Sequence, residues 1–151
     1  MLYLAADHRG FQLKEELKKY LVEQGHEVED VGAFAYNKDD DYVDFAREAA
    51  EKIAENPSVH RGIFICGSGH GMDVVASKHR GLLAAKCSDV ECAVQSREHG
   101  SSNVLTLGAD YTSFDKARKI VDVWLKTPFT GEERHVRRLK KIEEIEERNF
   151  K

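Results

Sequence analysis

Short apolar runs alternate with helical patterns along most of this chain, and that alternation limits the folds open to it more than any other feature. The runs fall at residues 2–6, 28–31, 62–66, 82–85 and 104–107. Between runs, apolar residues recur at the spacing of a helix face, as in the segment from Phe11 to Val22 that stops at Gly25. Strands that alternate with helices pair in parallel, because each helix carries the chain back across the sheet.

The predicted fold is therefore α/β: a Rossmann-like, doubly wound, five-stranded parallel sheet with a C-terminal helix. At 151 residues the chain can bury a core as one domain, residues 1–151, without a disulfide or a structural metal. Further helical patterns fall at residues 42–53, 93–97, 114–125 and about 132–148. The last of these is highly charged with a modest apolar seam, so we expect it to pack at a dimer interface.

The third apolar run ends in Cys66 and opens into Gly67-Ser68-Gly69-His70-Gly71. Glycines at alternate positions let backbone amides approach a ligand, and a helix that starts here aims its positive end at the same point. That environment favours the thiolate form of a cysteine. The segment fits an anion cradle beside a reactive thiol, and it also fits a tight strand-to-helix turn in which Cys66 only packs in the core.

Ligands of open parallel sheets bind beyond the carboxyl ends of the strands. This geometry predicts that Asp7 and His8, which follow the first strand, lie near Cys66 and the glycines. It also brings Asp110, after the last strand, toward the same edge. Asp7 could orient an imidazole or serve as a cap for the helix that follows.

Composition argues against several classes of protein. A formal charge of −4 gives no electrostatic reason to expect a nucleic acid or an anionic membrane as partner, and no apolar segment approaches the length of a membrane span. The three cysteines lack metal-ligand spacing and the seven histidines are scattered, so we predict no metal site. Free thiols are typical of a reducing compartment and predict a cytoplasmic protein.

These residues, in their order and spacing, resemble the ribose-5-phosphate isomerase B and galactose-6-phosphate isomerase family over essentially the whole chain. The matching segments are Asp7-His8, Asp41-Tyr42, Cys66 to Gly69, Gly71-Met72, Lys78, Gly81, Arg97-Glu98-His99, Asn103-Val104-Leu105, Arg134-His135 and Arg138. The resemblance implies an aldose–ketose isomerase that converts five- or six-carbon sugar phosphates through a cis-enediolate. It also implies a reaction without metal or organic cofactor, and a homodimer, or a dimer of dimers, whose active sites are shared between subunits.

Site roles follow from the resemblance. Cys66 is expected to remove the proton from carbon, Ser68 and the glycine-loop amides to bind the developing oxyanion, and His99 to move the proton in ring opening. Some relatives use a glutamate where this chain has Met72, so the cysteine mechanism is the one that transfers. The implied substrate-binding residues are Asp7, His8, Tyr42, Gly67, Gly69, His70, Gly71, Arg134 and Arg138.

Two of these assignments have simpler alternatives in the residues themselves. His99 fits a helix-end histidine that caps carbonyls. Arg134 and Arg138, four residues apart, share a helix face and can grip a phosphate together, but the run from Arg134 to Lys141 also fits a solvated basic surface.

The chain departs from the family pattern around the expected ligand. Gly100 replaces an asparagine, His70 an aliphatic residue and Asp73 a serine. Asp110 stands where relatives often have an arginine that helps to hold the phosphate, and a carboxylate there repels a dianion. These changes leave open an isomerase for a different pentose or hexose, with or without phosphate, and a catalytically silent binding subunit.

A dinucleotide-binding domain is a further alternative, because the glycines of residues 67–71 look superficially like a phosphate fingerprint. That fingerprint normally follows the first strand and reads G-x-G-x-x-G, which this segment does not.

Overall fold

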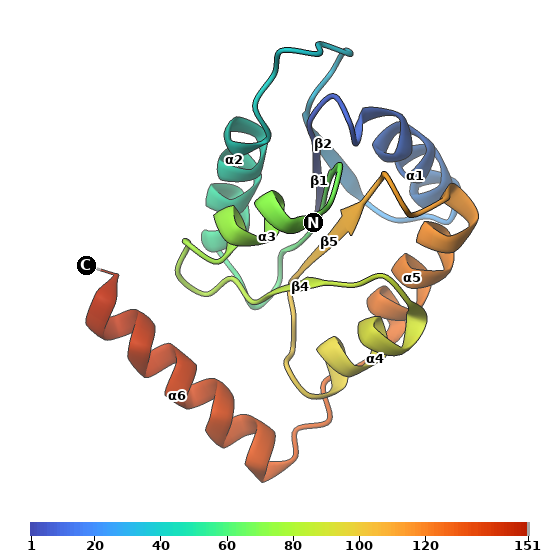
Figure 1. Cartoon of the computed structure of the whole chain (residues 1–151). Coiled ribbons are helices and arrows are strands. Elements are labelled where there is room, and N and C mark those ends of the chain that lie inside the picture. The colour runs from blue at the N-terminus through green and yellow to red at the C-terminus, as the bar shows by residue number, and fades with distance from the viewer. Residues whose placement is uncertain (151) are drawn as a thin grey trace.

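The computed structural model describes residues 1–150, which form five strands and six helices. Their bounds are β1 Leu2–Ala6, α1 Phe11–Glu23, β2 Val28–Gly32, α2 Tyr42–Ala54, β3 Arg61–Cys66, α3 His70–Ala76, β4 Ala84–Lys86, α4 Val90–Glu98, β5 Val104–Gly108, α5 Phe114–Lys126 and α6 Glu133–Asn149. All strands are parallel, in the order β2-β1-β3-β5-β4, and helices cover both faces of the sheet (Figure 1). The predicted α/β fold is confirmed.

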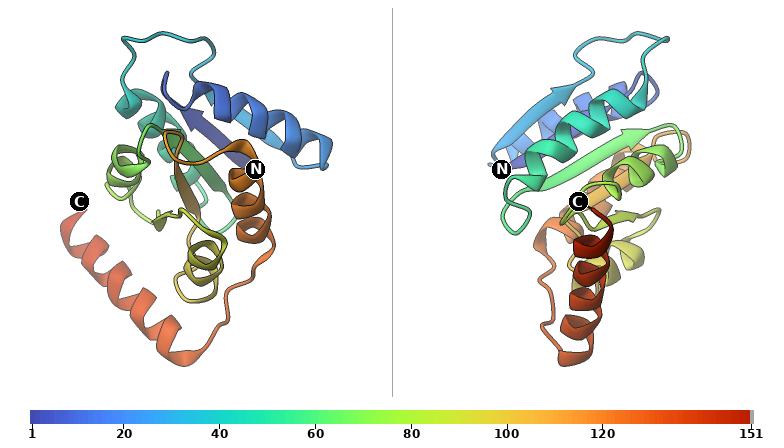
Figure 2. Two further views of the ribbon diagram at one scale, coloured as in Figure 1. Left: turned by 45° about the vertical axis from the view of Figure 1, so that its right-hand side comes forward. Right: turned by 90° about the vertical axis from the view of Figure 1, so that its left-hand side faces the viewer.

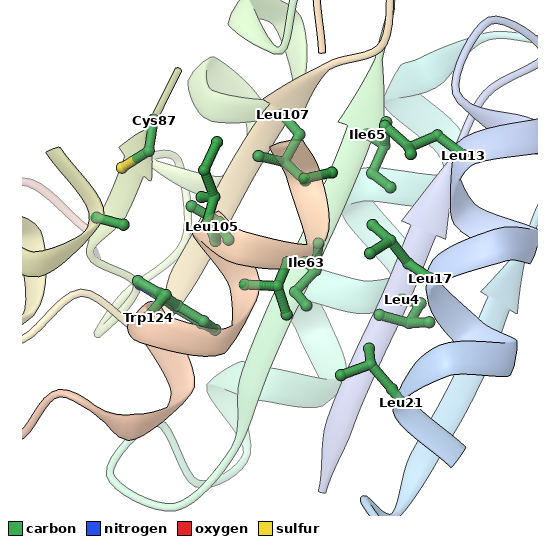
Figure 3. Packing of buried hydrophobic residues seen from close by; sticks show 14 of the residues in the cluster. Leu4, Leu13, Leu17, Leu21, Ile63, Ile65, Cys87, Leu105, Leu107 and Trp124 are labelled. Carbon is green, nitrogen blue, oxygen red and sulfur yellow. The ribbon is translucent and has the colours of Figure 1, made fainter. Parts of the chain in front are cut away.

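Successive side chains of each strand belong to two different cores. On β3, Ile63 and Ile65 cluster with residues of α1, α4 and α5, as Figure 3 shows for the largest members of this core. Phe64 and Cys66 point the other way and cluster with residues of α2 and α3. Because both faces are buried, the strands read as continuous apolar runs. Cys66 is thereby directed toward the side of the sheet where α2 and α3 begin.

The prediction for the fourth strand was displaced. The apolar run at 82–85 places the strand two residues early, because Leu82 is buried in the core whereas the ladder begins with Ala84 opposite Val104. The amide group of Leu83 donates to the side chain of Asn103 (2.8 Å), so a side-chain oxygen stands where a ladder partner would be. An apolar run marks burial, and it does not mark where backbone pairing starts.

Helix α6 stands apart from the helices that cover the sheet (Figure 2). Among its residues only His135 is buried, whereas Val136, Ile142 and Ile145 are exposed. A groove of about 490 Å³ separates it from the segment around Gly81 and Leu83, and the Glu146 carboxylate accepts a hydrogen bond from the Gly81 amide (3.0 Å). The apolar seam predicted from the sequence therefore has no cover within residues 1–150.

None of the helices formed by residues 1–150 combines the length and the apolar character that crossing a membrane requires.

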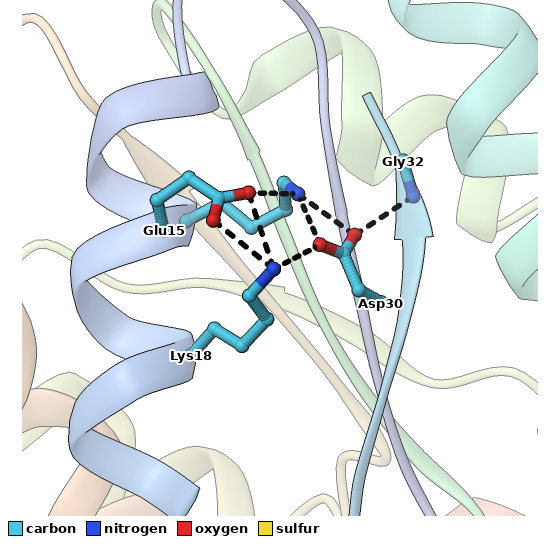
Figure 4. A network of polar contacts seen from close by, with 5 residues as sticks. Glu15, Lys18, Asp30 and Gly32 are labelled. Carbon is cyan, nitrogen blue, oxygen red and sulfur yellow. Dashed lines mark hydrogen bonds and ion pairs between the residues drawn. The ribbon is translucent and has the colours of Figure 1, made fainter. Parts of the chain in front are cut away.

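A buried lysine fastens α1 to β2. The side chain of Lys14 is fully buried, and its ammonium group contacts both oxygens of Asp30 at 2.7 Å. Figure 4 shows the network of polar contacts around Asp30. Lys18 and the amide of Gly32 also donate to this carboxylate. Partial burial raises the pKa of Asp30, but the hydrogen bonds from Lys14 and Lys18 lower it more, so the pKa lies below its usual value.

We predict that Asp30→Asn destabilises the protein by about 3 kcal/mol, because it leaves the buried ammonium of Lys14 without its nearest countercharge. Since folding lowers the pKa of Asp30, its contribution is present above about pH 4 and is lost as the pH falls through the lower folded value. Urea unfolding at several pH values measures both effects. Glu29→Gln, which removes an exposed pair with Lys52, is the matched control and should cost less than about 1 kcal/mol. Equal losses in the two variants would contradict this account.

Candidate active site

Parallel pairing brings three strand ends to one place. Ala6 of β1 lies opposite Ile65 of β3, and Cys66 lies opposite Gly108 of β5. The loop after β1 even packs on β3, since a Cβ on Gly10 would lie 2.4 Å from the carbonyl oxygen of Ile65. The loops that follow β1, β3 and β5 therefore meet at the carboxyl edge of the sheet, as the sequence predicted.

Cys66 ends β3 with its thiol almost fully buried under the glycine loop. The amide of Gly69 points at the sulfur, with a nitrogen–Sγ distance of 3.2 Å, and Gly69 has a positive φ of 79° that few other residues adopt. The next amide, that of His70, donates to the Ser68 hydroxyl (3.2 Å). The predicted amide cradle is thus partly used within the loop: one amide donates to the sulfur and another holds the Ser68 hydroxyl in place.

The aromatic ring of Tyr42 lies against the far end of this loop. A Cβ on Gly71 would come within 2.6 Å of the ring, so only glycine allows this approach. Tyr42 is 38% exposed and His70 is exposed, which leaves both side chains accessible from solvent. The structure therefore brings together the predicted residues Cys66, Ser68, Tyr42 and His70 at the carboxyl edge.

The loop after β1 adds Asp7 and His8, but not in the predicted relation. Asp7 accepts hydrogen bonds from the amides of Arg9 (3.0 Å) and Gly10 (3.1 Å), which closes a turn before α1. It does not cap this helix, whose N-cap is Gly10 and has no side-chain cap. The imidazole of His8 is oriented by Asp40 instead: Nδ1 lies 2.7 Å from Oδ1, and the His8 amide donates to the same oxygen. Because an ionised carboxylate only accepts hydrogen bonds, Nδ1 of His8 carries the proton. Nε2 of His8 can then accept a hydrogen bond or take up a proton.

Asp7, His8 and Asp40 also form the one cluster of metal-ligand type found among residues 1–150, with candidate ligand atoms within 4.8 Å of one another. The His8 ring is hydrogen-bonded to Asp40, and the Asp7 carboxylate accepts hydrogen bonds from two backbone amides. The cluster therefore fits a hydrogen-bonded network that positions His8.

Asp110, the departure noted after β5, is paired with a cation. Its carboxylate contacts the guanidinium of Arg9, and its amide donates to the carbonyl of Gly67 (3.0 Å). The tyrosine that follows, Tyr111, donates its hydroxyl to the carbonyl of Ser68. The segment after β5 is therefore bound directly to the glycine loop.

The remaining predicted residues lie at the opposite edge. β5 runs from Val104 to Gly108, beside Cys66, a length of about 13 Å. His99 follows α4 and precedes β5, so it belongs to the amino edge, away from Cys66. There its ring stacks on that of His135, with centroids 4.5 Å apart and planes 12° from parallel. Arg134 and Arg138 are exposed on the same first turns of α6.

His135 is the buried member of this second cluster. Burial lowers the pKa of its imidazole, and the neighbouring His99 and Arg134 lower it further. Its Nε2 is buried and has no hydrogen-bond partner within residues 1–150. One chain therefore carries two separate groups of candidate residues: a carboxyl-edge group around Cys66 and an amino-edge group around His99.

The sequence profile of the ribose/galactose isomerase family matches residues 2–142. The chain belongs to this family. It is 39% identical to ribose-5-phosphate isomerase B of Escherichia coli, a match that covers 94% of this chain and 93% of that protein. It is 38% identical to a putative sugar phosphate isomerase of Bacillus subtilis, with 97% of both chains covered.

Solved structures agree with this membership of the ribose/galactose isomerase family. Ribose-5-phosphate isomerase B of Clostridium thermocellum superposes with a TM-score of 0.91 at 41% identity, and 97% of each chain is covered. The enzyme of Mycoplasma genitalium, solved with bound ribulose-5-phosphate, gives a TM-score of 0.94 at 37% identity, with 97% and 95% covered.

Sequence reasoning missed two residues of the carboxyl-edge group, Arg9 and Asp40. Arg9 directly follows Asp7-His8 at a strand end, which was a usable signal for a place at the site. Asp40 lies in a polar loop with two other aspartates, and nothing in its spacing indicates which of them meets His8. The stacking of His99 on His135 was equally hidden, since it joins two helices far apart in sequence.

We predict that the imidazole of His135 titrates below the usual value of about 6.5, and that His99→Ala moves its pKa back toward that value by removing a neighbouring positive charge. Proton–nitrogen NMR of the histidine rings across a pH series measures both. Because folding lowers this pKa, acidification below about pH 6.5 should cost stability through His135. A His135 pKa at or above 6.5 would contradict the burial of this ring.

Proposed function

We propose that this member of the ribose/galactose isomerase family interconverts ribose 5-phosphate and ribulose 5-phosphate, with Cys66 as the base that acts on carbon. An aldose–ketose isomerisation of a sugar phosphate is the reaction class of its full-length relatives. The observation that carries the proposal for this chain is the Cys66 sulfur, held at the carboxyl edge with the Gly69 amide directed at it.

The reaction moves a carbonyl from C1 to C2 in the open-chain sugar. The Cys66 thiolate removes the proton from C2, and the electron pair moves through a cis-enediolate as the C1 carbonyl oxygen gains negative charge. The same sulfur returns the proton to C1, while the O2 proton is transferred to O1, so that the C2 carbonyl and the C1 hydroxyl form together. Hydrogen and electrons balance within the substrate, so the proposed mechanism uses no external electron carrier or other cofactor.

The glycine loop supplies the groups that such an intermediate needs. The hydroxyl of Ser68, fixed by the His70 amide, and the amides of Gly67 and Gly71 belong to the loop that follows Cys66 and can donate to the enediolate oxygens. The Nε2 atom of His8, left free by the bond of Nδ1 to Asp40, can hold a sugar hydroxyl or a phosphate oxygen.

We further propose that the active site is completed by a second copy of the chain. His99, Arg134 and Arg138, which would open the ring and bind phosphate, lie at the amino edge of their own sheet and away from their own Cys66. A partner that covers the apolar face of α6 would bury Val136, Ile142 and Ile145 and bring its amino-edge group to the Cys66 loop. A homodimer would both cover the apolar face of α6 and complete the site at Cys66. The three free thiols fit a cytoplasmic protein.

We predict that Cys66→Ala lowers isomerisation of ribose 5-phosphate at least about a hundredfold, because the base for carbon is lost, while sugar-phosphate binding persists. Proton NMR in deuterium oxide follows ketose formation and deuterium entry at C2, and calorimetry measures binding. Cys92→Ala, which removes a half-exposed thiol beside Cys87, is the control and should keep full activity. Unchanged exchange in Cys66→Ala would remove this residue from the mechanism.

The same assay, run on the unmodified protein with ribose 5-phosphate, allose 6-phosphate and galactose 6-phosphate, identifies the substrate. Turnover of ribose 5-phosphate in preference to the hexoses is expected. No turnover of any of the three would contradict the proposed function.

A mixing experiment tests the shared site. Cys66→Ala and His99→Ala are each expected to be inactive, but a heterodimer of the two contains one site with both residues intact. Random exchange should therefore restore about a quarter of the wild-type activity. If each site were built from one chain, the mixture would be as inactive as its components.

A further inference from the structure

An arginine outside the expected set lies directly on the glycine loop. A Cβ placed on Gly67 would lie 2.2 Å from Cζ of Arg9 and 2.5 Å from its Nε. The guanidinium thus occupies the space that any side chain at position 67 would take. Its own side chain remains 54% exposed, so this permanent charge is both anchored on the loop and accessible to a ligand.

Asp110 holds the guanidinium from the other side. Its carboxylate pairs with Nη2 of Arg9, while its amide is bound to the carbonyl of Gly67. An exposed ion pair of this kind adds little to stability. The pair matters more for geometry. Gly67 and Asp110, which lie in the loops after β3 and β5, together fix the position of the Arg9 guanidinium. The N–H donors of Arg9 that do not contact Asp110 can still bind a ligand.

The charges around the glycine loop make this guanidinium important for an anion. Asp7, Asp40 and Asp73 all lie at the carboxyl edge or at the start of α3, and they oppose the approach of a dianion. Another cation, Lys86, lies over the ring of Tyr111, with its ammonium nitrogen 5.4 Å from the ring centroid. Arg9 is a cation in direct contact with the loop that bears Cys66.

There is also space beside Arg9. A hollow of about 240 Å³ borders its side chain, and Ala109, Thr112 and Ser113 form part of the wall. The hydroxyl of Thr112 has no hydrogen-bond partner within residues 1–150, and Ser113 is the N-cap of α5, a helix of 13 residues. Hydroxyls and a helix N-terminus favour an anion here, whereas Glu16 on the rim opposes one.

We propose that Arg9, positioned by Asp110, is a phosphate-binding residue of this active site. The proposal rests on the proposed function, since the phosphate is that of the sugar-phosphate substrate. Asp110 then does not simply repel the substrate. Its carboxylate pairs with the guanidinium of Arg9 and orients it, and the remaining N–H donors of Arg9 bind the phosphate. The cation comes from the loop after β1 and the positioning carboxylate from the loop after β5.

The test compares Arg9→Gln with Arg118→Gln, which removes a similar exposed arginine–aspartate pair on α5. Loss of a charged hydrogen bond to phosphate should raise the KM for ribose 5-phosphate about tenfold to a hundredfold and leave kcat within about threefold. Inhibition by inorganic phosphate should weaken by a similar factor, while Arg118→Gln changes neither. Arg9→Lys, which keeps the charge without the fork, should fall between.

Asp110 is tested as a positioning residue. Asp110→Asn should raise the KM and the inhibition constant for phosphate together, with kcat nearly unchanged, and Asp110→Glu should restore both in part. A structural role alone would shift the melting temperature and leave the phosphate inhibition constant unaltered. Circular dichroism shows that each variant is folded before kinetics are compared.

The outcomes separate this inference from the proposed function. If Arg9→Gln keeps a KM and a phosphate inhibition constant within twofold of wild type, Arg9 does not bind phosphate and the inference is overturned. If the wild type turns over no sugar phosphate, the proposed function fails, and calorimetry with inorganic phosphate on wild type and Arg9→Gln still decides whether Arg9 binds the anion.

Discussion

The parallel register of β1, β3 and β5 is the constraint on which the rest of the site depends. It sets Ala6 beside Ile65 and Cys66 beside Gly108, so that three chain segments leave the sheet at the same edge. The alternation of strand side chains then turns Cys66 toward α2 and α3, where Tyr42 and the glycine loop meet. A shift of one residue in β3 would turn the thiol into the opposite core. The position of the reactive residues is thus fixed by backbone pairing within the sheet.

The same pairing separates the two groups of candidate residues. A helix that returns across the sheet must end at the amino edge, so the residues that follow α4 cannot reach the carboxyl edge of their own chain. The exposed apolar seam of α6, next to Arg134 and Arg138, gives a physical reason for a second copy to bind. Arg9 and Asp110 add to this picture: within a single chain, the carboxyl-edge group holds one guanidinium against the glycine loop.

The parts of the fold that follow from local periodicity could be predicted from the sequence. The predictions for helices such as α1 and α5 and for the buried strands were correct, because their apolar spacing is strong. The predicted position of β4 was displaced, because the amide of Leu83 donates to the side chain of Asn103 in place of a backbone partner in the ladder. The meeting of Asp7, His8 and Cys66 followed from the topology. Contacts between residues far apart in sequence could not be predicted, because no periodic pattern marks them. In this way Asp40, and not Asp7, binds the His8 ring, Arg9 pairs with Asp110, and His99 stacks on His135.

The most direct test of the proposed shared site is a proximity measurement between chains. In a background of Cys66→Ala, Cys87→Ala and Cys92→Ala, one protein would carry His70→Cys on the glycine loop and another His99→Cys on the amino edge. After the two are mixed, a short thiol–thiol cross-linker should join them as a covalent dimer, to a far greater extent than either protein alone. A single chain that carries both cysteines and cross-links within itself, as a monomer, would contradict the account.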